Sequence, residues 1–116
     1  MTREPSDFDV KTQRIGSTAL IDVRGELDIA TLPELEQAVT RMRAQGLERM
    51  VVDLRGLSFM DSMSIELLLR VHGELAATGA ELVVVRGPRA VDRIFQVMKL
   101  ERVLALVDEP PALRPS

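Results

Sequence analysis

A buried strand that leads through a short loop into a helix, between residues 51 and 69, constrains this sequence most. Residues 50–54 form a β-branched and aliphatic run with the length and composition of a buried strand. Arg55-Gly56 breaks that strand, and residues 57–60 form a second short apolar segment. Asp61 and Ser62 therefore lie where an apolar strand leads into a helix. A helix N-terminus offers unpaired N–H groups and the positive end of the dipole, so a hydroxyl there is well placed to carry a phosphate.

The helical pattern after Ser62 has one apolar side, formed by Ile65, Leu68, Leu69, His72 and Leu75. His72 has no metal-ligating partner at the i+4 position, so we interpret it as a packed or partly exposed helix residue. Ten residues separate Ser62 from His72, about 15 Å along a helix, which excludes a Ser–His–Asp triad. On local sequence alone, helix capping is the commonest role for residues such as Asp61 and Ser62.

Two strands and a helix are predicted before this unit. Residues 8–15 and 18–24 alternate as the two strands of a hairpin, and residues 25–28 end the second strand. Residues 31–34, Thr-Leu-Pro-Glu, have the spacing of a capping box with proline in the first helical turn, and Gly46 closes the helix that comes next.

A strand, a helix and a last short strand are predicted after the unit. Residues 81–86 form a strand buried on both faces, and the turn at Gly87-Pro88 ends it. Residues 88–98 form a short helix, and residues 100–107 hold one more turn and the last strand. The side chains predicted to point inward from this helix are Val91, Ile94, Phe95 and Met98.

The element order β-β-α-β-α-β-α-β predicts the α/β class. We expect a mixed, mostly parallel sheet of about five strands with three to four helices, and a first strand paired antiparallel. A chain of 116 residues fits one such domain. We expect the domain to span residues 8–108, between a flexible lead at residues 1–7 and a flexible tail at residues 109–116.

The composition excludes several classes of function. The net charge is −3 and only 3% of residues are aromatic, so the chain lacks the basic and stacking surface that binds nucleic acid. Without cysteine there is no thiol chemistry, and the chain suits a reducing cytoplasm. Residues 1–9 are polar and no apolar run approaches about 20 residues, so we expect no signal peptide and no membrane insertion. We also expect no enzyme activity, no metal and no cofactor, because no glycine-rich phosphate loop or catalytic constellation is present.

From about residue 10 to residue 107 the chain resembles a STAS domain, and in particular the bacterial anti-sigma factor antagonists. The segments that carry the resemblance, in order, are Gly25-Glu26-Leu27-Asp28, Leu57-Ser58-Phe59-Met60-Asp61-Ser62, Gly87-Pro88 and Lys99-Leu100. The resemblance implies that Ser62 accepts phosphate and that Asp28 lies near it. It also implies a partner anti-sigma factor, a serine kinase of the histidine-kinase ATPase type, and a PP2C-like serine phosphatase that resets the switch.

The chain departs from the family pattern Asp-Ser-Ser-Gly-Leu-Gly directly after the acceptor. Ser64 and Glu66 stand where that pattern has glycine. Glycine at a helix start allows a partner backbone to approach closely, so these substitutions are expected to change partner choice or weaken binding. Ser64 also becomes a candidate second acceptor. We expect Asp28, Asp61, Met63 and Ser64 to form the surface around Ser62 that contacts the partner.

Two other functions remain open. A STAS domain can serve as a non-catalytic subunit of a stress-signalling assembly or of a transporter complex. A response-regulator receiver has similar length and alternation, with Asp53 at a strand end as its acceptor. A receiver needs an acidic pair after its first strand and a late lysine after a strand, whereas this chain has Gly16-Ser17 and only Lys99 on a helix.

Overall fold

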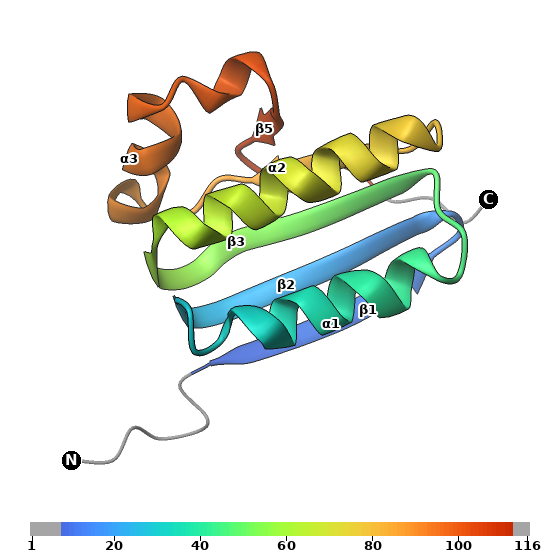
Figure 1. Cartoon of the computed structure of the whole chain (residues 1–116), viewed down its shortest axis with the longest axis horizontal. Helices are drawn as coiled ribbons and strands as arrows, with labels where there is room; N and C mark the ends of the chain where they lie inside the picture. The colour runs from blue at the N-terminus through green and yellow to red at the C-terminus, as the bar shows by residue number, and fades with distance from the viewer. Residues whose placement is uncertain (1–7, 113–116) are drawn as a thin grey trace.

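The computed structural model describes residues 8–112 and contains one five-stranded sheet. The elements in chain order are β1 (Asp9–Ile15), β2 (Thr18–Leu27), α1 (Leu32–Arg43), β3 (Arg49–Met60), α2 (Ser62–Ala77), β4 (Glu81–Val85), α3 (Arg89–Val97), the 3₁₀ turn η2 (Leu100–Arg102) and β5 (Ala105–Val107). The strands lie in the order β1-β2-β3-β4-β5 (Figure 1). Strand β1 pairs antiparallel with β2, and the remaining pairs are parallel. The predicted fold class and element order are confirmed.

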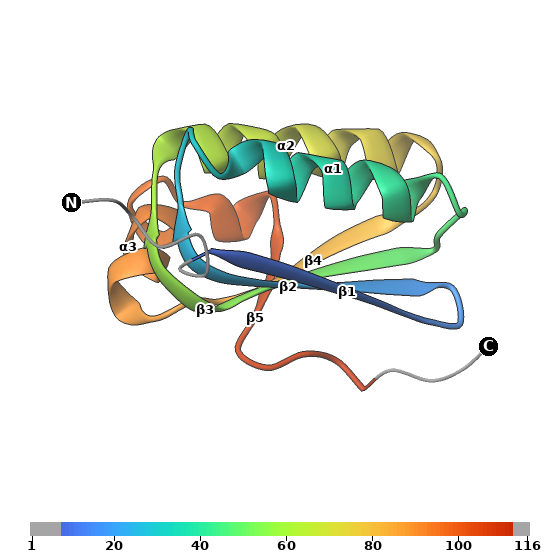
Figure 2. The same ribbon diagram turned by 90° about the horizontal axis from the view of Figure 1, so that it is seen from below.

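Helices α1 and α2 lie side by side on one face of the sheet, and α3 packs against β3 near the start of α2 (Figures 1 and 2). Alternate strand residues such as Ile21, Val52 and Val84 point to the main core, because successive strand side chains face opposite sides. Phe95 of α3 is fully buried in the same core. No helix within residues 8–112 is long and apolar enough to cross a membrane.

The opposite face of the sheet has a small apolar cluster of its own. Val51, Val83 and Val85 are buried there, although α1 and α2 cover the other side. The chain after β5 turns onto this face (Figure 2), and the Arg86 N–H donates a hydrogen bond to the Val107 carbonyl. Two segments were predicted to be flexible, residues 1–7 and residues 109–116. All of the first and residues 113–116 of the second lie outside the described residues.

Strand β3 continues through Arg55-Gly56, so the predicted break there is wrong. Asp22 pairs with Asp53 and Arg24 pairs with Gly56, so two residues of β3 oppose one residue of β2 in a β-bulge. A side chain at Gly56 would meet β2, since a Cβ there would lie 3.1 Å from the Val23 carbonyl oxygen. Glycine therefore maintains the close approach of the two strands, and its presence in the sequence marks a bulge.

Two predicted inward faces also need correction. Met98 is 48% exposed, because α3 ends at Val97 and the chain turns away through Lys99 in the left-handed region with a φ of 54°. On α2, Leu69 and His72 are only half-buried. The helix lies beside α1 and packs on β4, so its buried face is shifted toward Ser64, Leu67 and Val71. The buried α2 residues are Ser64, Ile65, Leu67, Leu68, Val71 and Leu75.

Candidate functional site

Strands β2 and β3 end together, and this places the two predicted acidic residues at the same edge of the sheet. Leu27 pairs with Met60 in parallel register, so Asp28 and Asp61 each come directly after the last residue of neighbouring strands. The Asp61 N–H donates to the Leu27 carbonyl over 3.3 Å and extends the pairing by one residue. Both helices begin at this edge (Figure 1), so the β2–α1 turn lies beside the start of α2.

Asp61 is the N-cap of α2, and Ser62 is the first helical residue. The Asp61 backbone is extended, with φ −104° and ψ 176°, and its carboxylate accepts a hydrogen bond from the Ser64 N–H at 3.2 Å. The Ser62 side chain is exposed beside the first turn of the helix, where backbone N–H groups and the helix dipole favour an anion. The sequence therefore placed the Ser62 hydroxyl at a helix start correctly, although capping belongs to Asp61.

Ser64 does not share the exposure of Ser62. Its exposed fraction is 0%, and its Oγ lies 3.1 Å from the Asp61 Oδ1 and 3.4 Å from the Leu27 carbonyl oxygen. A kinase cannot reach a hydroxyl enclosed in this way, so the structure contradicts the expectation of a second acceptor here. The Ser64 side chain is also withdrawn from the surface that a partner would touch.

Asp28 organises the turn between β2 and α1. Its Oδ1 accepts hydrogen bonds from the N–H groups of Ala30 and Thr31 at 3.0 and 3.2 Å, and its carbonyl accepts from Leu32 N at 2.8 Å. The predicted capping box is wrong, because the Thr31 side chain makes no cap bond to α1. The Thr31 hydroxyl instead donates to the Glu26 carbonyl and accepts from the Asp28 N–H. Asp28 therefore supports local structure as well as lying beside the start of α2.

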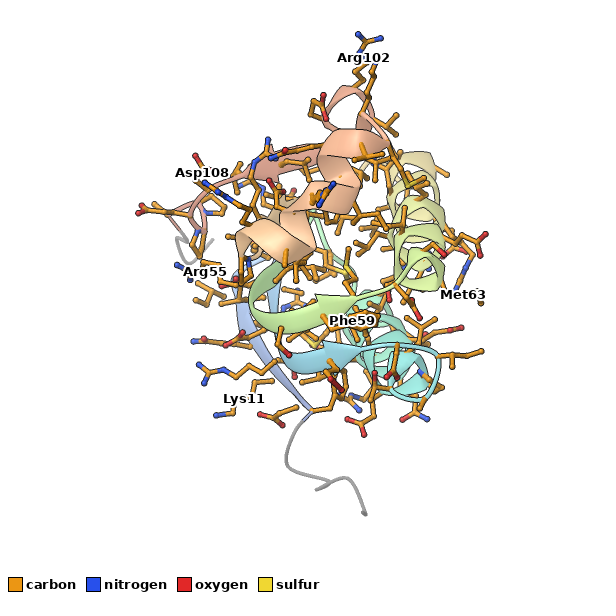
Figure 3. All side chains as sticks on the ribbon, turned by 90° about the vertical axis from the view of Figure 1, so that its left-hand side faces the viewer. Lys11, Arg55, Phe59, Met63, Arg102 and Asp108 are labelled. Atoms are coloured by element: carbon orange, nitrogen blue, oxygen red, sulfur yellow. The ribbon has the colours of Figure 1, made fainter. Side chains whose placement is uncertain are left out.

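Three large apolar side chains are exposed at this edge, and we call them the apolar patch: Ile29, Phe59 and Met63, which are 70%, 48% and 43% exposed. Ile29 lies in the β2–α1 turn, Phe59 near the end of β3 and Met63 in the first turn of α2. Figure 3 shows Phe59 and Met63 on the end of the molecule that faces the viewer. Of these three residues, only Met63 was predicted from the sequence to lie on the surface that contacts the partner. A β-bulge before Phe59 sets the direction of its side chain. In the sequence Phe59 is part of an apolar run, so it could not be told from a core residue.

The segments that form this edge carry acids without bases. Residues 26–40 contain Glu26, Asp28, Glu34 and Glu36 and no lysine or arginine. Residues 56–69 contain only Asp61 and Glu66 as charged residues, and Glu66 is exposed one helical turn after Ser62. Residues 26–40 and 56–69 therefore supply no cation to a phosphate on Ser62, and the group within them that favours a phosphate is the N-terminus of α2.

Asp53, the acceptor in the receiver alternative, is not presented at a strand end. It lies inside β3 two residues after Val51, hence on the same face of the sheet as Val51, and is only 6% exposed. The Arg55 side chain donates to both of its carboxylate oxygens, at distances of 2.9–3.2 Å. This hydrogen bonding and the Asp53 charge raise the pKa of Arg55 above its ordinary value. The ion pair gives Asp53 a structural partner and argues against a receiver-type phosphate site.

Neither a metal cluster nor the cavity between α1 and α2 is found at the Ser62 edge within residues 8–112. No cluster of His, Cys, Asp and Glu within residues 8–112 could hold a metal ion. A cavity of about 570 Å³ lies at the opposite ends of α1 and α2, between Thr40, Arg43 and Leu75. At the edge that carries Ser62, the Ser62 side chain and the apolar patch are exposed, and an exposed apolar patch suits contact with another macromolecule.

A family model and a curated relative both match most of this chain. A STAS domain model matches residues 9–111. An anti-sigma-B factor antagonist of Staphylococcus aureus (strain NCTC 8325 / PS 47) is 32% identical over 84 residues, which cover 72% of this chain and 78% of the relative.

Two solved structures show the same fold. A crystal structure of an anti-sigma factor antagonist from Mycobacterium paratuberculosis has a TM-score of 0.83 at 23% identity, over 93% of this chain and 92% of the other. The phosphorylated form of the Bacillus cell fate determinant SpoIIAA has a TM-score of 0.66 at 22% identity, over 88% and 92% of the two chains. At these identities the similarity establishes the architecture.

Proposed function

The chain belongs to the STAS domain family, and on this basis we propose that it is an anti-sigma factor antagonist controlled by phosphorylation of Ser62. The observation that carries the proposal is an exposed hydroxyl at the first position of α2, next to the apolar patch. The name of the Staphylococcus aureus relative and the existence of a phosphorylated SpoIIAA structure support it. The protein would act in the cytoplasm as a binding protein without catalysis of its own.

In the unphosphorylated state the apolar patch would dock on an anti-sigma factor and free the sigma factor that it holds. The partner that fits the proposal is a serine kinase of the histidine-kinase ATPase type, which transfers phosphate to Ser62. A PP2C-like serine phosphatase would remove the phosphate and restore binding. Asp28, Asp61 and Met63 surround the acceptor in this scheme, and Ser64 contributes from beneath the surface.

The switch arises from the electrostatics of this edge. Phosphate adds about −1.5 to −2 charges at Ser62, where the nearby segments already carry Asp61, Asp28 and Glu66. The N-terminus of α2 can accommodate the dianion while it is hydrated, so the fold is retained. A docked partner would have to desolvate that charge, and an unpaired buried charge costs about 3–5 kcal/mol. At about 1.4 kcal/mol for each tenfold change, the affinity falls by more than about a hundredfold.

Phosphate transfer to Ser62 is the direct test of the proposal. After reaction with the cognate anti-sigma kinase and ATP, phosphopeptide mapping should find the label on Ser62. Absence of transfer, with the chain folded and the kinase active on another substrate, would favour the role of a non-catalytic STAS subunit. The exposed Glu66 one turn from Ser62 is the feature that favours this alternative, because its charge opposes a nearby phosphate.

Removal of an aromatic side chain from the apolar patch should weaken partner binding without unfolding the protein. Phe59→Ala is expected to weaken binding about five- to thirtyfold, which corresponds to about 1–2 kcal/mol for an aromatic interface residue. Because Phe59 is 48% exposed, its truncation should lower the free energy of unfolding by only about 0.8–1.5 kcal/mol, half the value for a fully buried Phe. The measurement is calorimetric titration with the anti-sigma partner.

Val103→Ala is the matched control for Phe59→Ala. Val103 is 50% exposed and comes after Arg102, which Figure 3 shows far from Phe59 and Met63. Its removal should leave the affinity within about twofold. Equal losses for Phe59→Ala and Val103→Ala would show that the patch is not the docking surface.

Asp28→Ala should reduce both stability and partner binding, since this carboxylate supports the β2–α1 turn. Loss of its two backbone hydrogen bonds is expected to cost about 1 kcal/mol, as for a helix cap, and to lower Tm by about 4–8 °C. Asp28→Asn keeps an acceptor oxygen without the charge and should recover most of the stability. If both variants bind as well per folded molecule as the unmodified protein, Asp28 has a structural role alone.

A further inference from the structure

We propose that Ser64 is a positioning residue for phosphate transfer: its buried hydroxyl holds the Asp61 carboxylate and thereby fixes the first turn of α2 that presents Ser62. The inference rests on the proposed function, because it concerns the reaction at Ser62. It assigns Ser64 a role beneath the site in place of the acceptor role that its sequence position suggested.

The Ser64 hydroxyl lies between the N-cap of α2 and the end of β2. Its Oγ lies 3.1 Å from the Asp61 Oδ1 and 3.4 Å from the Leu27 carbonyl oxygen, and the side chain is fully buried. A hydroxyl donates one hydrogen, and the charged oxygen at the shorter distance is the stronger acceptor. The Ser64 Oγ therefore donates to Asp61, at the point where the end of β2 meets the start of α2.

Asp61 is consequently held by two donors from the same residue. The Ser64 N–H and the Ser64 hydroxyl both reach the Asp61 Oδ1, at 3.2 and 3.1 Å. The Asp61 N–H is bound in turn to the Leu27 carbonyl at 3.3 Å. These bonds fix the residue directly before Ser62 at its carboxylate and at its backbone.

Burial of the Ser64 hydroxyl has an energetic cost, which indicates that its hydrogen bonds stabilise the first turn of α2. A buried hydroxyl loses its water, and the loss is compensated only by hydrogen bonds of good geometry. No buried side-chain nitrogen or oxygen within residues 8–112 lacks a partner, so Ser64 is fully accommodated. Phosphate transfer depends steeply on the position of the nucleophile, and a displacement of about 1 Å can cost about a hundredfold in rate.

Ser64→Ala removes the hydroxyl and leaves the cap bond from the Ser64 N–H to Asp61 in place. Steady-state phosphorylation of Ser62 by the anti-sigma kinase with saturating ATP then separates a positioning role from a structural one. Positioning predicts a fall in kcat of about tenfold or more with KM for the antagonist changed less than about twofold. A merely structural role lowers the folded fraction, which raises the apparent KM and leaves kcat unchanged.

Thr78→Ala is the matched control, because the Thr78 hydroxyl donates to the Leu75 carbonyl at the far end of α2. It should leave kcat and KM unchanged. Unchanged kcat in Ser64→Ala, with the unmodified chain phosphorylated on Ser62, would overturn the inference and leave the proposed function standing. Failure of the unmodified chain to accept phosphate would overturn both.

Amide hydrogen exchange gives a second test that needs no kinase. In Ser64→Ala the Asp61 carboxylate keeps the N–H of residue 64 as a donor but loses the hydroxyl, so this cap bond is weakened. The N–H of residue 64 should therefore exchange about tenfold faster, while the middle of α2 should be unaffected. If Ser64→Ala does not fold, the same exchange and kinetic measurements on Ser64→Gly decide the matter. Unchanged exchange at this position in the variant that folds would overturn the inference.

Discussion

Ser62→Asp should bind the anti-sigma partner at least about a hundredfold more weakly than Ser62→Ala. The aspartate places a charge at the first position of α2 that docking would have to desolvate, next to the apolar patch. Ser62→Ala carries no charge and should bind as tightly as the unmodified protein. It should also stay bound when ATP is added, because no hydroxyl is left to accept phosphate. Isothermal titration with and without ATP measures both effects.

The two Ser62 variants should be equally well folded, which separates the effect of charge from that of stability. Asp61 supplies the cap of α2, so neither substitution removes the cap hydrogen bond. An acid in the first helical turn gains about 0.3–1 kcal/mol from the dipole, and repulsion from Asp61 and from Glu66 at the i+4 position offsets part of this gain. The free energies of unfolding of the two variants should therefore differ by less than about 1 kcal/mol. Equal affinity of the two variants for the partner would rule out the switch and favour a non-catalytic STAS subunit.

Phe95→Ala should lose about 3–5 kcal/mol of the free energy of unfolding, the largest effect on stability that we expect from one substitution. Phe95 is fully buried and packs α3 into the main core, which also contains Leu54 and Val91. Its removal leaves a cavity that the sheet cannot close. A small domain has only about 5–15 kcal/mol of stability, so the variant should be partly unfolded near about 37 °C. Urea denaturation followed by far-UV circular dichroism measures the loss.

Val97→Ala is the control for Phe95→Ala. It lies on the same helix two residues later and is 72% exposed, so its removal should cost less than about 0.5 kcal/mol. A small loss in Phe95→Ala, close to that of Val97→Ala, would show that α3 contributes little to the core. Any loss of partner binding in Phe95→Ala should match the fraction of the variant that is unfolded, because Phe95 is not part of the apolar patch.

The order of the elements and the place of Ser62 could both be predicted from the sequence, because each depends on local patterns. The apolar run before Asp61 and the periodicity after it locate a strand end and a helix start within one residue. The alternation of strands and helices then makes a parallel sheet the consistent solution, with the β1–β2 hairpin as its antiparallel edge. The side-chain directions in the first turn of α2 were harder to predict, as the burial of Ser64 shows.

The features that were missed depend on contacts between segments distant in the sequence. Arg55-Gly56 has the local pattern of a break, yet pairing with β2 keeps it within β3 as a bulge. Thr31 has the spacing of a capping residue, but the Glu26 carbonyl and the Asp28 N–H engage its hydroxyl instead.

The residue pattern alone was enough to establish the fold class, the strand–helix junction and the serine at the start of α2, since propensity and periodicity act over a few residues. Tertiary contacts were needed to establish which side chains surround that serine. Paired ends of β2 and β3 bring Ile29 and Phe59 to the same edge as Met63, and they bury the Ser64 hydroxyl beneath Asp61. Strand register and bulges set the direction of each side chain, and both arise from hydrogen bonds between strands about 30 residues apart in the chain.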